Sequence, residues 1–129
     1  MSRKIEDLTP ETQEKFQEFK EKMDDAEIPF MATSTRRTQA EQEKLWAQGR
    51  TKPGKIVTWT LKSKHLEGKA FDIAILKNGK PVWDVKVDVN FDEEPDYYQA
   101  GLIGERVGLI WGGRFRRADF PHFELDEES

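Results

Sequence analysis

The chain has 129 residues, 36% of them charged, and a formal net charge of −4 at pH 7. This length is typical of one domain that buries enough surface to fold without covalent staples. Cysteine is absent, which excludes disulfide frameworks, thiolate metal sites and a cysteine nucleophile, and fits a reducing compartment. Acidic and basic residues are mixed along the chain, so we expect no nucleic-acid partner.

The N-terminal segment bears on where the protein works. Residues 1–23 contain no apolar stretch of the kind found in signal peptides, and no run approaches the roughly 18 apolar residues of a membrane helix. We therefore expect synthesis in the cytoplasm without a signal peptide, and no membrane insertion. No repeat or linker divides the sequence, so we expect one domain over residues 1–129 and a monomer.

A helix and a strand are predicted first. Thr9 followed by Pro10 is typical of a helix start. Apolar residues then recur at helical spacing, which predicts an amphipathic helix over residues 10–25. These residues are Phe16, Phe19 and Met23. The segment IPFMATST at 28–35 alternates loosely between apolar and polar residues, and we expect a strand there.

A second helix follows. Thr38 with Glu41 three positions later forms a capping box, which predicts a helix over residues 39–48 that stops at Gly49. Residues 50–62 contain a proline and a glycine and are expected to form a loop with a short extended piece.

A hairpin is predicted in the middle of the chain. KAFDIAIL at 69–76 is typical of a strand, and Asn78-Gly79 supplies the positive φ angles of a type I′ turn. The returning strand is expected over residues 81–87. An acidic loop at 88–96 follows it.

The last third of the chain adds a helix and two strands. Residues 97–108 predict a third helix, weakened by two internal glycines, and we expect short strands at 109–113 and 122–125. Helices and strands mix without a regular βαβ rhythm. The sequence therefore predicts an α+β domain with a small antiparallel sheet and about three helices.

Strand alternation places candidate chemistry on one face of the sheet. In KAFDIAIL the apolar side chains share the core face, whereas Asp72 lies on the other face between Ala70 and Ala74. The small alanines leave room above Asp72. His65 precedes this strand, and Gly68 between the two lets the backbone turn back towards the strand.

A second cluster contains the other histidine. In HFEL, His122 and Glu124 share a face, and Asp119 precedes His122 by three residues. Two histidines and one carboxylate are a common ligand set for catalytic zinc, and a further carboxylate can act as general base. From these residues alone, two ordinary hydrogen-bonded histidines remain the alternative.

The motif pattern carries a resemblance. SKHLEGKAFD at 63–72 resembles the S-x-H-x-x-G-x-A-x-D signature of the zinc D,D-peptidase family (M15-type). That family includes VanX- and VanY-type enzymes and the L-alanyl-D-glutamate peptidases that serve as phage endolysins. Two further family elements follow the same order, one in RRTQAEQ at 36–42 and one in DFPH at 119–122. The resemblance covers residues 28–125.

Carried onto this sequence, the resemblance implies a hedgehog-like D,D-peptidase fold with one zinc ion per chain. The implied zinc ligands are His65, Asp72 and His122. Asp119 would be the general base, and Arg37 would stabilise the oxyanion, a role typically worth a few kcal/mol. The implied substrate-binding residues are Ser63 and Gln42. Adjacent residues on an extended segment face opposite sides, so we expect Arg37 to enter the site and Arg36 to face solvent.

The resemblance implies a peptidoglycan stem-peptide hydrolase. With no signal peptide and one domain, we expect a phage endolysin with L-Ala–D-Glu endopeptidase activity that reaches the cell wall after release through a holin. The alternatives are a D-Ala–D-Ala carboxypeptidase or dipeptidase of the same family, and a non-catalytic, zinc-stabilised wall-binding module.

Three other features leave a choice of interpretation. Trp59, Trp83 and Trp111 could line a substrate groove, but we expect core packing for them, and also for Trp46 on the second helix. DVNFDEE at 88–94 begins like a calcium loop, yet it lacks the glycine at the sixth position and has Gln99 where the last ligand should be, so a solvated acidic loop is expected. Arg114 follows WGG where many relatives have aspartate, which alters either the substrate pocket or a surface turn.

Overall fold

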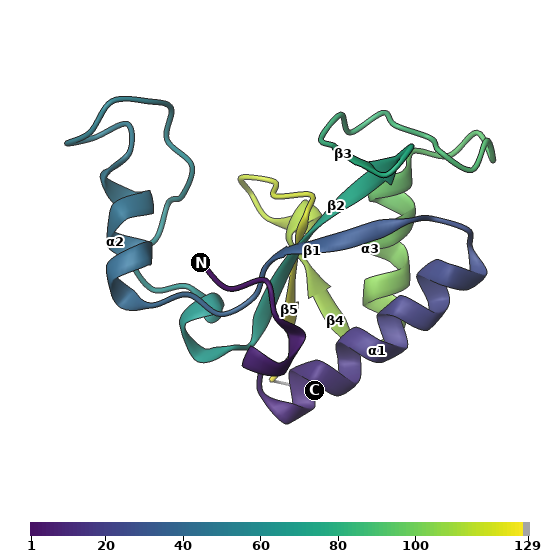
Figure 1. Cartoon of the computed structure of the whole chain (residues 1–129), viewed down its shortest axis with the longest axis horizontal. Helices are drawn as coiled ribbons and strands as arrows, with labels where there is room; N and C mark the ends of the chain where they lie inside the picture. Colours follow the sequence, from purple (N-terminus) through teal and green to yellow (C-terminus); the bar gives the residue numbers. More distant parts are fainter. Residues whose placement is uncertain (128–129) are drawn as a thin grey trace.

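A five-stranded antiparallel sheet forms the centre of the computed structural model, which describes residues 1–127 (Figure 1). The strands are β1 (Phe30–Ser34), β2 (Ala70–Lys77), β3 (Lys80–Val82), β4 (Leu109–Trp111) and β5 (His122–Leu125). Their order is β1-β2-β5-β4, and β3 pairs with the far end of β2. The α-helices are α1 (Pro10–Asp25), α2 (Gln39–Ala47) and α3 (Asp96–Arg106). The predicted α+β class is confirmed.

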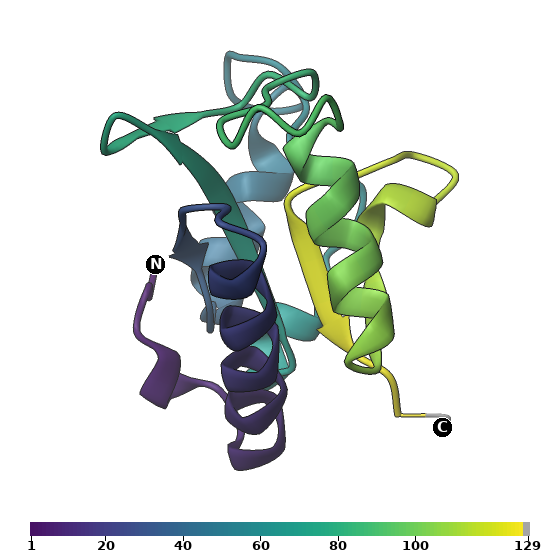
Figure 2. The same ribbon diagram turned by 90° about the vertical axis from the view of Figure 1, so that its right-hand side faces the viewer.

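The helices divide between the two sides of the sheet. α1 and α3 lie side by side over one face, and α2 lies on the opposite side (Figures 1 and 2). The core fills the space under α1 and α3. Phe19 of α1 packs 4.8 Å from Phe123 of β5, measured between ring centroids, and 5.7 Å from Phe71 of β2. The other face of β2 is therefore left for the site.

Local capping chemistry sets the helix starts. The Thr9 hydroxyl accepts a hydrogen bond from the Thr12 amide at the start of α1, and the predicted capping box of α2 is complete, since Glu41 also accepts from the Thr38 amide. The predicted range of α1 is confirmed. α2 ends one residue earlier than expected.

The two glycines of α3 bring the helix close to the sheet. A Cβ atom on Gly101 would lie 2.2 Å from the Trp111 ring, and one on Gly104 would lie 2.6 Å from the Phe123 ring. Glycine costs about 1 kcal/mol in a helix interior, but here it permits a contact that no larger residue would allow. From the sequence, these glycines were expected only to weaken the helix, and their packing role was not predicted.

The hairpin differs in part from its prediction. Asn78 and Gly79 have φ angles of 53° and 77°, as the expected turn requires. The returning strand, however, ends at Val82 rather than continuing to residue 87. The Tyr97 hydroxyl accepts from the Ile75 amide and donates to the Val82 carbonyl, so it is inserted between β2 and β3 and ends their direct pairing. Among residues 1–127, no helix is both long and apolar enough to span a bilayer.

Candidate active site

Asp72 lies at the centre of the site because of its place in the sheet. In the antiparallel register it pairs with Ser34 of β1 on one side and with His122 of β5 on the other. Directly opposed residues hold their side chains close together. The neighbouring Ala70 and Ala74 are fully buried, and of these three residues Asp72 alone lines the cleft.

His65 reaches Asp72 from η2 (Lys64–Glu67), a 3₁₀-helix just before β2. The Ser63 hydroxyl caps η2 by accepting from the His65 amide, and Gly68 ends it with a φ of 71°. Nδ1 of His65 lies 2.6 Å from the Thr35 carbonyl oxygen, so this nitrogen carries the proton and donates. Its Nε2 faces Asp72 Oδ1 at 3.2 Å.

His122 is held in the same manner by Glu124. Its Nε2 donates to Glu124 Oε1 at 2.9 Å, and its Nδ1 lies 3.1 Å from Asp72 Oδ1. Carboxylates that accept from the outer nitrogen of a ligating histidine are common around metals. Burial lowers the pKa of His122, but the hydrogen bonds to Asp72 and Glu124 outweigh it and raise the pKa to about 9.

The donor set fits a metal cation. The ligand atoms of His65, Asp72 and His122 all lie within 4.8 Å of one another. Tetrahedral zinc ligands are roughly 3.4 Å apart, close to the two distances from Asp72. Burial raises the pKa of Asp72, yet hydrogen bonds from the two histidines hold it well below its usual range. A proton on the facing imidazole nitrogen makes each of these hydrogen bonds, and a metal cation that replaced the protons would meet two nitrogen lone pairs and a carboxylate oxygen.

Arg37 enters the site, as the sequence predicts. Its Nη2 donates to Asp72 Oδ2 at 3.1 Å and its Nη1 to Gln42 Oε1 at 3.2 Å. Gln42 is fully buried and donates to the Thr60 carbonyl. Gln42, expected from the sequence to bind substrate, therefore contacts the Arg37 guanidinium and is not among the residues that line the cleft. Arg36 is exposed and is not among the residues that line the cleft.

Asp119 lies on the wall of the same cleft. The residue is exposed overall, but partial desolvation of its carboxyl group, with the negative charge of Asp72, raises its pKa. The turn that presents Asp119 packs closely against Gly112. A Cβ atom on Gly112 would lie 2.4 Å from the Asp119 carbonyl oxygen. A raised pKa suits a group that must take up and release a proton.

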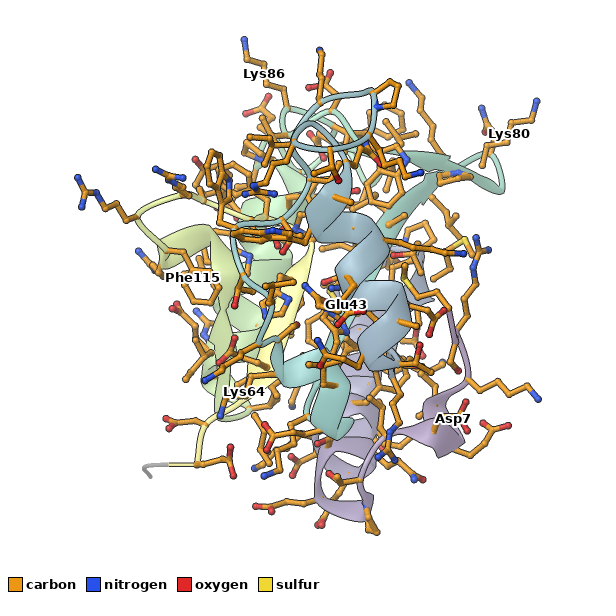
Figure 3. All side chains as sticks on the ribbon, turned by 90° about the vertical axis from the view of Figure 1, so that its left-hand side faces the viewer. Asp7, Glu43, Lys64, Lys80, Lys86 and Phe115 are labelled. Carbon is orange, nitrogen blue, oxygen red and sulfur yellow. The ribbon has the colours of Figure 1, made fainter. Side chains whose placement is uncertain are left out.

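The cleft has a volume of about 850 Å³ and two walls. One wall is the segment 57–65, and the other is the segment 115–119. The walls meet where the Arg117 guanidinium lies 3.6 Å from the centre of the Trp59 ring, a cation–π contact. In Figure 3, which faces this side of the molecule, Phe115 projects from the segment after β4 and Lys64 from η2.

The tryptophan prediction is confirmed only in part. Trp111 is buried in the core, but Trp59 and Trp83 are 57% and 55% exposed. Trp46 is partly buried and stacks on Arg50, whose guanidinium lies 3.6 Å from the ring centre. Trp59 is therefore a cleft-wall residue, the alternative that the sequence left open.

Two further placements complete the site. Ser63 lines the cleft, although its hydroxyl is already occupied by the cap of η2. Arg114 turns away and forms a two-pronged contact with Glu105 of α3, at 3.0 and 3.1 Å, so it belongs to a surface turn. The sequence did not indicate that the Thr35 carbonyl accepts a hydrogen bond from His65 and orients its ring. Glu124 could have been given its orienting role, because alternation already placed it beside His122.

Known proteins resemble this chain in sequence. Residues 57–125, more than half of the chain, match the M15 peptidase family model described as D-alanyl-D-alanine carboxypeptidase. Over 102 residues the chain is 37% identical to the peptidoglycan L-alanyl-D-glutamate endopeptidase CwlK of Bacillus subtilis strain 168. The aligned part is 76% of this chain and spans 61% of the length of CwlK.

Two solved structures share the fold. The crystal structure of the L-Ala D-Glu endopeptidase ChiX from Serratia marcescens matches with a TM-score of 0.70 and 22% identity, over 95% of this chain and 83% of that one. The LD-carboxypeptidase LdcB matches with a TM-score of 0.69 and 15% identity, over 92% and 58%. The sequence match and the common fold agree: the chain belongs to the D-alanyl-D-alanine carboxypeptidase family of M15 peptidases.

Proposed function

We propose that this chain is a zinc-dependent peptidase that cleaves the stem peptides of peptidoglycan, with the L-Ala–D-Glu bond as its target. The observation that carries the proposal is the meeting of His65, Asp72 and His122 in one cleft with Asp119 and Arg37. A structural metal site would need neither the free carboxyl group nor the arginine. The identity to CwlK supports the choice of bond.

The proposed roles follow from the geometry. His65, Asp72 and His122 would hold one zinc ion, which supplies Lewis acidity and lowers the pKa of water towards neutrality. Asp119 takes a proton from the attacking water and later gives it to the nitrogen of the leaving amine. Arg37 keeps unused N–H donors, including a buried Nε without a partner, and donates to the carbonyl oxygen as negative charge develops there.

The family description favours a second bond. A D-alanyl-D-alanine carboxypeptidase would release free D-alanine from the end of the stem peptide. Incubation of purified peptidoglycan with the protein, with and without a chelator, separates the possibilities by mass spectrometry. L-Ala–D-Glu cleavage creates a new N-terminal D-glutamate, and carboxypeptidase action releases D-alanine. A product-free digest would instead favour a wall-binding module without turnover.

We further propose that the protein acts as a monomeric phage endolysin. In that case it is made in the host cytoplasm and needs a holin to reach the cell wall. Expression in bacteria should lyse the cells only when a pore-forming holin is expressed with it. Lysis by the chain alone would contradict this part of the proposal and would leave the peptidase assignment untouched.

Arg37→Ala is expected to lower turnover on peptidoglycan by at least about 10²-fold, the scale of a lost oxyanion donor. Arg37→Lys should also be poor, because an ammonium lacks the planar fork that reaches Asp72 and Gln42 together. Arg36→Ala is the matched control and should change little. Zinc content is measured in each variant. A greater loss in Arg36→Ala than in Arg37→Ala would show that Arg36 is the group at the carbonyl.

Trp59→Ala is expected to raise KM several-fold on soluble stem peptides while kcat stays within about a factor of two. The exposed ring and Arg117 join the two cleft walls beside the substrate path, and uniform binding contacts affect KM alone. Trp83→Ala is the control, because Trp83 is equally exposed but does not line the cleft. Equal effects of the two substitutions on KM would mean that Trp59 does not contribute to substrate binding.

A further inference from the structure

A second cluster of acidic side chains lies in the loop between β3 and α3. Asp88, Asp92 and Asp96 each present a carboxylate oxygen, and these oxygens lie within 4.8 Å of one another. Among residues 1–127, no lysine or arginine forms an ion pair with any of the three. Three carboxylates at such short distances repel one another unless a cation lies between them.

Buried oxygens without partners make this cluster unlike a solvated acidic loop. Asp96 is fully buried; its Oδ2 accepts from the Val89 amide at 2.6 Å, but its Oδ1 has no hydrogen-bond partner. Gln99 follows three residues later on the same face of α3, and its Oε1 is also buried without a partner. Burial, reinforced by the charges of Asp88 and Asp92, raises the pKa of Asp96. Buried acceptors left unsatisfied are costly.

The spacing of these oxygens is that of a calcium loop. Counted from Asp88, the side-chain oxygens fall at positions 1, 3, 5, 9 and 12. The residues are Asp88, Asn90, Asp92, Asp96 and Gln99. The sixth position lacks the usual glycine, but Glu93 takes the left-handed conformation that glycine supplies there, with a φ of 69°. The amides of Asp92 and Glu93 both donate to the Asp88 carboxylate, so the loop already curls around it.

We propose that residues 88–99 bind one calcium ion, at a site separate from His65, Asp72 and His122. The donors are all oxygens, which suit calcium, magnesium or manganese better than zinc. The loop is irregular and supplies several carboxylates, which suits the flexible coordination of calcium better than the strict octahedron of magnesium. The ion would join the loop to the start of α3 and satisfy the buried Asp96 oxygen.

Isothermal titration of calcium chloride into the zinc-loaded full chain tests the proposal. We expect one site with a Kd of about 10⁻⁵ to 10⁻³ M, within the range of calcium loops. Asp92→Asn and Asp96→Asn should each weaken binding at least about 10-fold. Glu93→Gln, which removes an equal charge from a residue whose side chain is not a ligand, is the matched control and should stay within about 2-fold.

The thermal melting temperature gives a second readout. Calcium at a concentration that saturates the unaltered chain should raise its Tm by several degrees and raise the Tm of Asp92→Asn clearly less. Asp92 is exposed, so Asp92→Asn should fold normally. It therefore tests the calcium site even if Asp96→Asn fails to fold. No saturable heat up to about 5 mM calcium would overturn the proposal, as would equal weakening by Glu93→Gln. His65→Ala must keep calcium binding, since its loss would assign the ion to the histidine site.

Discussion

His65→Ala is expected to leave the purified protein without bound zinc and without turnover on peptidoglycan. The unaltered chain should hold one equivalent after zinc loading. His65 supplies one of three ligands, and its Nε2 is directed inward because the Thr35 carbonyl fixes the proton on Nδ1. Removal of that nitrogen leaves two protein ligands, too few for the usual catalytic zinc site. Elemental analysis after loading and desalting measures the content, and circular dichroism checks the fold.

Graded variants make the zinc test specific. Glu124→Gln keeps all three ligands but weakens the carboxylate that orients His122, so we expect affinity to fall about 10- to 100-fold, the range for outer partners of a ligand. Affinity should also fall on acidification, because ligating histidines must be neutral. Full zinc retention by His65→Ala, or less than about half an equivalent in the loaded unaltered chain, would refute the ligand assignment.

The sequence predicted most of the local structure because local chemistry determines it. The hydroxyl of Thr9 and the capping box at Thr38 act within four residues, so the starts of α1 and α2 could be read directly. The same holds for the turn at Asn78, where φ must be positive. Strand alternation also separated Asp72 from the core residues of β2 correctly.

Long-range contacts explain what the sequence did not predict. Asp72 and His122 are 50 positions apart, and only the register of β2 with β5 brings them opposite each other. The Thr35 carbonyl has no sequence signal, because every residue carries one. The end of β3 depends on the Tyr97 hydroxyl from a distant helix. Trp59 was expected in the core on its hydrophobicity alone, which does not distinguish a core residue from a cleft wall.

Asp119→Ala is expected to keep the fold and the zinc and to lose about 10² to 10⁴ in turnover, the usual contribution of a general base. Asp119 is the carboxyl group on the cleft wall without a hydrogen-bonding histidine, and its raised pKa suits proton uptake. Glu124 is the other candidate, but its carboxylate already accepts from His122 Nε2. It is therefore engaged in orienting a ligand.

The measurement pairs turnover on peptidoglycan with zinc content for Asp119→Ala and for Arg116→Ala, an exposed residue of the same segment that does not line the cleft. Arg116→Ala should behave as the unaltered chain in both assays, which controls for disturbance of the segment. Near-normal turnover by Asp119→Ala would transfer the base role to another group, with Glu124 first. Loss of zinc by Asp119→Ala would instead add Asp119 to the ligands. Retained zinc with turnover reduced 10²-fold or more is the one combination in which Asp119 moves the proton while the metal site stays intact.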